Sequence, residues 1–424
     1  MEIEVIDSTE GLLALGEEWE ALEARDPHAS FYASYRFVKA WWLAYCDDPS
    51  YVLHTLGVRH NGALVAVAPL AIRQTKSRGR DLRTLRWASH GDYLGAVVEV
   101  ASASAASRAL LTAMDGSQQW DRIALGNMRS DTPLAHYLFR SSHNSSFTLH
   151  VECPYIDLRE YADFDDFCAR SLPSHTRKYR NKFVKELDAR FTVTWGNASQ
   201  VLQRMGAVHQ AERDFLREHR DRDERHSLFD DPRRVSLVEG AYEREGDAVT
   251  FAYEDSAGRM LGYRSCYVHG RTLLSWNSAY EPQMEPYRLG KVLQYDIMGH
   301  LFSQGEWDFF DFGAGRYPWK FEWTHQFNST YRYARSFEPP AKPVAARKPA
   351  TSAAATATQD ASSTAAQPPP SHSTEAPHTS PPARRTIRSV PAVGARRASQ
   401  ALRAMTDSVT ARRKPPVIWY LPHP

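Results

Sequence analysis

The sequence Tyr287-Arg288-Leu289-Gly290-Lys291-Val292-Leu293 lies between an apolar, strand-like run and a helix-like pattern. The first N–H groups of a helix lack partners within the helix and lie at the positive end of its dipole, so a phosphate group binds well there. Gly290 lets the backbone approach such a group closely, and Arg288 and Lys291 add positive charge. The stretch therefore predicts either an anion site at a helix start or an ordinary strand-to-helix junction.

The segments around this stretch alternate in the way that a mixed α/β unit does. Three strand-like runs precede it, with turns at Ala257-Gly258 and His269-Gly270, and a helix and another strand follow it. In chain order these are Ala248–Tyr253, Met260–Val268, Thr272–Ala279, Gly290–Phe302 and Trp307–Phe312.

A second motif follows the last of these strands. It reads Asp311-Phe312-Gly313-Ala314-Gly315-Arg316-Tyr317-Pro318-Trp319-Lys320-Phe321-Glu322-Trp323. An Asp before a glycine-rich segment is typical of a turn. A carboxylate at a strand end beside an anion site is also a candidate general base.

The two motifs together resemble the acyl-CoA site of the GNAT acetyltransferases. That family's loop is usually Gln or Arg, two residues, Gly, one residue, then Gly or Ala; the Arg288-x-Gly290 form is shorter and lacks the second glycine. It is similar instead to the branch of CelD and BioF-like proteins and the FemAB peptidoglycan aminoacyltransferases. In that branch the closing strand ends in Asp-x-Gly-x-Gly and an aromatic-Lys pair follows, as at Trp319-Lys320.

Earlier segments extend the resemblance. Phe31–Tyr35 and Trp41-Trp42 resemble the branch's aromatic N-terminal helix, and Val65–Leu70 resembles its first hairpin. Asp92-Tyr93 lies where the branch often has an Asp-Tyr pair, and the basic segment His175–Arg190 corresponds to its Lys/Arg-rich start of the second half.

The resemblance covers about residues 1–337 and implies an α/β fold of tandem GNAT-like units with mixed central sheets. We expect an N-terminal unit at residues 1–154, on the acceptor side and without a cofactor. A C-terminal unit at residues 155–338 would bind acyl-CoA. Residues 339–424 are rich in Ala, Pro, Ser and Thr, and we predict a disordered basic tail there because such a composition buries too little apolar surface.

Charge is divided unevenly along the chain. From residue 341 onward Lys and Arg outnumber Asp and Glu by 12 to 3, which leaves 52 − 12 = 40 basic and 50 − 3 = 47 acidic residues in the body. An acidic body argues against a nucleic-acid partner, and the basic tail leaves a weak membrane or protein contact open. The four Cys residues form no metal-type cluster, no apolar run predicts a membrane span, and the acidic N-terminus does not resemble a signal peptide, so we expect no metal and a cytoplasmic protein.

The resemblance implies direct attack of an amine on an acyl-CoA thioester, with no covalent enzyme intermediate. The expected cofactor contacts are Arg288, Leu289, Gly290, Lys291 and Val292. The candidate bases are Asp311, Glu322 and His325, and Tyr317 is the candidate acid for the leaving thiolate. Simpler roles remain open for each of them: a turn for Asp311, packing for Tyr317 and a loop position for His325.

The acceptor side is expected to use residues from both halves of the chain. These are Asp92, Tyr93, Arg177, Lys178 and Lys320. The basic helix that carries Arg177 and Lys178 is either a wall for an anionic acceptor or an ordinary solvated face. Lys320 either binds a phosphate or the acceptor, or is solvated.

The expected activity is an acyl-CoA-dependent N-acyltransferase, with acetyl-CoA or another acyl-CoA as co-substrate. The expected acceptor is a small molecule with a primary amine, such as an amino sugar, in polysaccharide or envelope synthesis. Two alternatives remain: a FemAB-like enzyme that uses aminoacyl-tRNA, and a non-catalytic GNAT-like scaffold that works through its tail. The acidic body counts against the first alternative.

Deleting every residue after Phe337 is expected to leave the melting temperature unchanged, because the deleted segment has the composition of a chain that buries little surface. Thermal unfolding of the full and truncated proteins, followed by circular dichroism, checks this. A fall of more than about 4 °C, equivalent to roughly 1 kcal/mol or more at this size, would contradict it.

Overall fold

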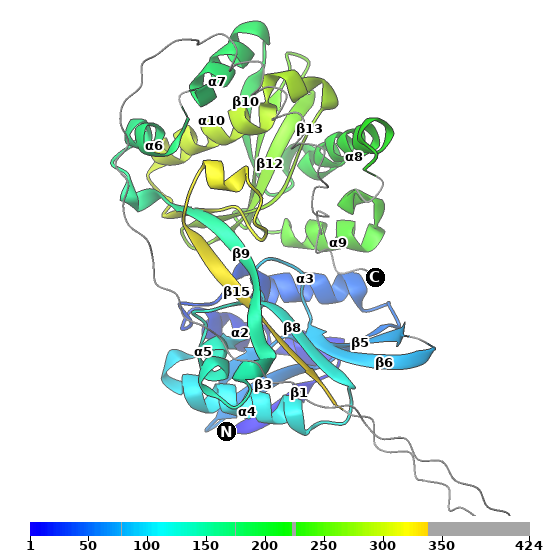
Figure 1. Cartoon of the computed structure of the whole chain (residues 1–424). Coiled ribbons are helices and arrows are strands. Elements are labelled where there is room, and N and C mark those ends of the chain that lie inside the picture. Colours follow the sequence, from blue (N-terminus) through cyan, green and yellow to red (C-terminus); the bar gives the residue numbers. More distant parts are fainter. Residues whose placement is uncertain (78, 174, 223–225, 338–424) are drawn as a thin grey trace, which may run out of the picture. The chain divides into compact units, whose positions relative to one another are not determined.

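A computed structural model describes residues 1–77, 79–173, 175–222 and 226–337 (Figure 1). These residues form helices packed on large mixed sheets, so the predicted α/β fold is confirmed. The predicted tail at residues 339–424 lies outside the described residues.

Helices occur throughout the described chain. The α-helices are α1 (Thr9–Ala14), α2 (Gly16–Glu23), α3 (Tyr35–Tyr45), α4 (Ala103–Gly116), α5 (Pro133–Arg140), α6 (Phe164–Ser171), α7 (His175–Glu186), α8 (Val201–Arg220), α9 (Pro232–Ala241) and α10 (Leu289–Gln304). Short 3₁₀ turns that matter below are η1 (Phe31–Ala33), η7 (Pro282–Tyr287) and η8 (Lys320–Glu322).

Strands fill the space between these helices. They are β1 (Glu2–Ile6), β2 (Tyr51–Leu53), β3 (Thr55–His60), β4 (Ala63–Ala68), β5 (Leu70–Ser77), β6 (Arg80–Trp87), β7 (Val97–Val98), β8 (Arg122–Arg129), β9 (Phe147–Asp157), β10 (Arg190–Trp195), β11 (Ala248–Glu254), β12 (Met260–His269), β13 (Thr272–Tyr280), β14 (Phe309–Asp311) and β15 (Phe327–Ser336).

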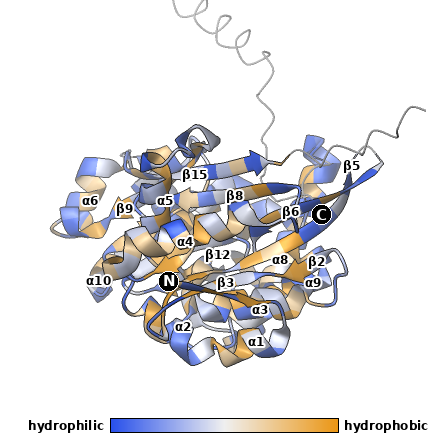
Figure 2. Ribbon diagram, turned by 90° about the horizontal axis from the view of Figure 1, so that it is seen from below, coloured by the Kyte–Doolittle hydropathy of each residue, from blue (hydrophilic) through white to orange (hydrophobic). Residues whose placement is uncertain are grey.

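A four-stranded antiparallel sheet has the order β1-β3-β4-β7. The predicted hairpin is confirmed in it, since β3 and β4 are joined at Asn61-Gly62, where both residues have positive φ (52° and 83°). This backbone matches the right-handed twist of the flanking strands. The neighbouring β5 is hydrophobic where it begins and hydrophilic at its far end, where it leaves the core (Figure 2).

The larger sheet has eleven strands among the described residues, in the order β10-β11-β12-β13-β14-β9-β15-β8-β6-β5-β2. Its last strand in the sequence, β15, pairs with β9 on one side and with β8 on the other (Figure 1). In turn, β9 pairs with β14 on its other edge. The C-terminal strand therefore completes a sheet that begins in the first half of the chain, and the expected boundary between residues 154 and 155, still a prediction, falls within β9.

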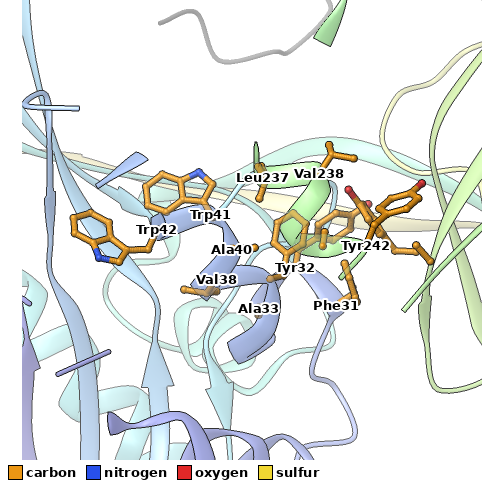
Figure 3. Packing of buried hydrophobic residues seen from close by; sticks show 14 of the residues in the cluster. Phe31, Tyr32, Ala33, Val38, Ala40, Trp41, Trp42, Leu237, Val238 and Tyr242 are labelled. Atoms are coloured by element: carbon orange, nitrogen blue, oxygen red, sulfur yellow. The ribbon is translucent and has the colours of Figure 1, made fainter. Parts of the chain in front are cut away.

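Buried aromatic and aliphatic side chains connect early and late segments of the chain. Figure 3 shows Ala40 and Trp41 of α3 near Leu237 and Val238 of α9, and the two helices pack against each other. All four side chains are buried, so this contact joins a helix of the first half to a helix of the second half. Burial of apolar surface of this kind stabilises a fold by about 25 cal/mol per Å².

Most of the helices and strands expected from the sequence are confirmed within a few residues. Apolar residues at helical spacing from Leu12 to Leu22, after the candidate cap Ser8, predict a single helix. This prediction is wrong in detail, because the chain bends at Leu15, which ends α1 and precedes α2. Six strands and helices were not expected: β1, β7, α5, β9, β10 and α9.

Replacing Tyr333 with Ala is expected to lower the free energy of unfolding by about 3 kcal/mol, the usual cost of truncating a buried aromatic side chain. Tyr333 lies on β15 and is 0% exposed within the core built from β3 to β8. Urea unfolding measures the effect, with Arg332→Ala as the control, because Arg332 is the exposed neighbour on the same strand. Equal effects of the two substitutions would contradict the placement of β15 in this core.

Candidate active site

The parallel strands β13 and β14 pair over only three positions, from Thr272 opposite Phe309 to Leu274 opposite Asp311. β14 then ends, while β13 continues to Tyr280. A β-bulge also interrupts the pairing of β13 with β12, since Ser275 and Asn277 oppose successive residues of β12 and Trp276 is passed over. A bulge leaves its extra residue outside the ladder, so Trp276 opposes no residue of β12, and beyond Leu274 the other edge of β13 pairs with no strand of the described residues.

Helix α10 begins close to the same region. Arg288 precedes it in a left-handed conformation (φ 56°), and no side chain caps the helix. An added Cβ at Gly290 would only reach ordinary contact distance, 3.8 Å, from the Tyr280 ring. The protein itself therefore does not require a glycine at this position, which is consistent with a ligand that approaches the helix start closely.

The five predicted cofactor residues differ in what their side chains do. Leu289 and Val292 are fully buried in the core, so only their backbone groups can face a ligand. Arg288 is exposed and lies 5.8 Å from the centre of the Tyr179 ring of α7. Lys291 forms an ion pair with Glu322, which connects the start of α10 to η8.

Asp311, at the end of β14, is the centre of a buried polar cluster. The Tyr93 hydroxyl donates a hydrogen bond to its Oδ2 at 2.5 Å, and the Gly313 N–H donates to its Oδ1 at 2.7 Å. Asp311 and Tyr93 are 3% and 2% exposed. The structure thus brings a predicted acceptor-side residue into contact with a predicted base.

Asp92 and Lys320 complete this cluster. Lys320, 4% exposed, donates through Nζ to the Gly313 and Ala314 carbonyls, both at 2.8 Å. Asp92 packs so closely that a Cβ at Gly313 would lie 2.3 Å from its Oδ2, and Gly313 also has φ 71°. Glycine is therefore required at this position for both steric and conformational reasons.

Burial shifts the ionisation of all three charged groups. It raises the pKa of Asp311 to about 7, although the Tyr93 hydrogen bond lowers it. Burial also raises the pKa of Asp92, against the attraction of Lys320. Burial lowers the pKa of Lys320, and the negative charge of Asp92 partly offsets this lowering. A carboxyl that titrates near neutral pH at a strand end can exchange a proton with a substrate amine.

The remaining predicted residues lie outside this cluster. Glu322 is exposed and paired with Lys291, His325 is exposed, and Tyr317 is partly buried beside the Lys320 ammonium, 5.2 Å from the ring centre. Arg177 and Lys178 are exposed on α7, which packs against α10 and η7. Arg177 acts electrostatically on Cys168 of α6 and on Tyr295 of α10, so it lies beside the middle of α10.

Two buried residues near the cluster were not predicted as site residues. Cys153 of β9 is 0% exposed, and burial raises the pKa of its thiol well above the usual value. Arg264 of β12 is 5% exposed, and its positive charge disfavours the charged form of Lys320. A charged residue in the middle of an apolar strand is a signal that could have identified Arg264 from the sequence alone.

Comparisons with known proteins bear on the fold of the described region. Residues 173–321 match the family described as an acetyltransferase (GNAT) domain. The solved structure of FemX has a TM-score of 0.52 and 12% identity, over 78% of this chain and 97% of that one, which shows that the described region shares its fold. Among curated protein sequences, none matches this chain.

Two further solved structures have lower scores. The tandem GNAT protein from the clavulanic acid pathway has a TM-score of 0.43 and 13% identity, over 80% of this chain and 99% of that one. The C-terminal domain of a putative lysylphosphatidylglycerol synthetase from Agrobacterium fabrum has a TM-score of 0.47 and 13% identity, over 76% of this chain and 91% of that one. In the described residues, no group of three or more His, Cys, Asp or Glu could hold a metal ion, and no helix is long and apolar enough to cross a membrane.

The raised pKa of Asp311 predicts a stability that depends on pH. Between pH 4 and 7 the folded protein keeps a proton on Asp311 that the unfolded chain releases, so the free energy of unfolding falls as the pH rises through this window. A shift of about three pKa units corresponds to roughly 4 kcal/mol at most. Asp311→Asn removes this pH-dependent contribution to the free energy of unfolding. The stability of the variant relative to the wild type should therefore rise from pH 4 to pH 8.

Urea unfolding at several pH values measures this difference. Asp188→Asn serves as the control, because Asp188 is an exposed carboxylate outside the cluster. A stability difference between Asp311→Asn and the wild type that stays constant across this pH range would show that Asp311 is ionised normally.

Proposed function

We propose that this protein is an acyl-CoA-dependent N-acyltransferase that acts on a small polar amine, such as an amino sugar, because residues 173–321 match the acetyltransferase (GNAT) domain family. The observation that carries the proposal is that the β13–β14 pairing ends at Asp311, while β13 continues towards the uncapped start of α10. This combination supplies a backbone edge for the donor, an anion site for its phosphates and a base for the amine.

The donor's phosphates are assigned to the start of α10. Backbone N–H groups of the first helical turn and the helix dipole favour a pyrophosphate there. Arg288 and Lys291 supply positive charge, and the basic residues of α7 lie alongside. Beyond Leu274, the edge of β13 that faces away from β12 then binds the extended pantetheine arm through backbone hydrogen bonds.

The reaction joins the amine nitrogen to the acyl carbon and breaks the carbon–sulfur bond of the thioester. Asp311 takes the proton that the amine loses, either directly or through one water molecule. We assign the backbone N–H of Trp276, at the bulge, as a donor to the oxyanion that forms on the thioester carbonyl. The leaving thiolate gains a proton, for which Tyr317 is our candidate acid.

Tyr93, Asp92 and Lys320 act on Asp311 and not on the substrate in this proposal. The Tyr93 hydrogen bond orients the carboxylate, while burial keeps its pKa near neutral. Lys320 holds the 313–320 turn closed through two carbonyl contacts. A base with a pKa near the working pH is the most effective one for this step.

A FemAB-like transfer from aminoacyl-tRNA is the second candidate. The observation that favours it is the run of five basic residues on α7, against one Glu, beside the start of α10. The body as a whole has 47 acidic against 40 basic residues (50 − 3 and 52 − 12), which disfavours a long nucleic acid because tRNA binding needs a broad basic surface. A short polyanion such as CoA fits the limited basic area better.

Calorimetric titration with acetyl-CoA tests the donor. We expect micromolar binding by the wild type and a loss of about 10- to 100-fold or more in the Arg288→Ala, Gly290→Asp double variant, because a charge-assisted hydrogen bond contributes about 1.5–3 kcal/mol. Arg259→Ala is the control, since Arg259 is an exposed arginine of the same half whose ion pair is with Asp255. Tight binding of aminoacyl-tRNA with no binding of acetyl-CoA or of longer acyl-CoAs would support the second candidate instead.

A further inference from the structure

Arg264 lies in the middle of β12, between β11 and β13, and is 5% exposed. Its guanidinium donates one hydrogen bond, from Nη1 to the Ser275 hydroxyl at 3.2 Å. The centre of the Trp319 ring lies 5.1 Å from it. Buried arginines are usually paired with a carboxylate, but no ion pair joins Arg264 to any carboxylate among the described residues.

The Nε of Arg264 is buried and has no hydrogen-bond partner in the described part of the chain. An unsatisfied buried donor costs about 1–3 kcal/mol, and more when it is charged. Its single bond to a neutral hydroxyl does not offset the loss of water around a full positive charge. This is the arrangement expected of a guanidinium whose acidic partner comes from a bound molecule.

The charged groups around Arg264 favour the binding of one more negative group. Arg264 lies close enough to Lys320 to disfavour its charged form, and Asp92 and Asp311 act on Lys320 with the opposite sign. Burial raises the pKa of both carboxyls and lowers the pKa of Lys320. A ligand with a single negative charge would neutralise the Arg264 guanidinium, which forms no ion pair with a carboxylate of the described residues.

Arg264 also lies next to the reacting part of the sheet. Its partner Ser275 is the first residue of β13 beyond the last β13–β14 pair. Trp319, which is 37% exposed, covers the guanidinium on the side of the 313–320 turn. Arg264, Asp92 and Asp311 all act electrostatically on Lys320, so a group bound to Arg264 would lie near the Asp92–Asp311 cluster.

We propose that Arg264 binds a carboxylate group of a substrate, with the Trp319 ring covering the bound group. A carboxylate matches the planar pair of donors that Nε and one terminal nitrogen of a guanidinium present, and it carries the single charge that the site lacks. That the group belongs to a substrate rests on the proposed acyl transfer. The carboxylate could belong to the acyl donor or to the acceptor.

The carboxylate site is tested with sodium succinate as the probe. The melting temperature of the full chain is measured against succinate concentration, with ionic strength held constant by NaCl. Succinate is expected to raise the melting temperature of the wild type to a plateau and to have no such effect on Arg264→Met or Arg264→Lys, because a lysine cannot supply two parallel donors. The lysine variant keeps the charge and serves if the methionine variant does not fold.

The control is Arg190→Met, since the Arg190 side chain is 80% exposed; it should respond as the wild type does. The proposal is overturned if succinate does not stabilise the wild type, or if the Arg264 variants are stabilised to the same extent.

Two thioesters then distinguish the sources of the carboxylate. Succinyl-CoA and butyryl-CoA both carry four-carbon acyl groups, which end in a carboxylate and a methyl group respectively. If the donor carries the carboxylate, the wild type binds succinyl-CoA about 10-fold or more tightly than butyryl-CoA, and Arg264→Met loses this preference. If the acceptor carries it, both thioesters bind alike and succinate still stabilises the CoA-saturated wild type. Failure to bind either thioester would reject the proposed function, whereas the succinate titration decides the carboxylate site by itself.

Discussion

The hydrogen bond from Tyr93 to Asp311 joins residues that are 218 positions apart in the sequence. It forms only if the loop after β6 meets the end of β14, and therefore only if the two halves of the chain pack as they do here. Both groups are buried, so removing either partner would leave the other group with one hydrogen bond fewer and no water to replace it. The geometry of the candidate site thus depends on this one contact between the halves.

The exchange of strands explains how that contact is maintained. β15 follows the 313–320 turn in the sequence but pairs with β8 of the first half, and Asn328 of β15 donates to the Tyr93 hydroxyl at 3.4 Å. β9 links the same sheet to β14, which carries Asp311. Each half therefore supplies a strand or a side chain that the other half needs, and the polar cluster lies where these exchanges meet.

Much of the local structure could be predicted from the sequence, because it depends on short-range patterns. The Asn61-Gly62 hairpin, the helix after Arg288 and the strand that ends at Asp311 follow from turn residues and periodicity. β9 could have been found as well, since Phe147, Leu149, Val151 and Cys153 alternate with polar residues.

The assembly of the site could not be predicted in the same way. The family resemblance pointed to Asp92, Tyr93 and Asp311 separately, but their proximity depends on contacts between distant segments. The burial that shifts the pKa of Asp311 arises from the same contacts. That Arg264 forms no ion pair with a carboxylate of the described residues is likewise a three-dimensional fact, which no spacing in the sequence reveals.

A crystal structure of the full chain with acetyl-CoA would test the central claim most directly, because it shows where the donor lies relative to Asp311. The account predicts the pyrophosphate at the N–H groups that begin α10, the pantetheine arm along β13 beyond Leu274, and the thioester carbonyl between Trp276 and Asp311. Acetyl-CoA bound elsewhere, with the opening between β13 and β14 filled by protein side chains, would contradict it.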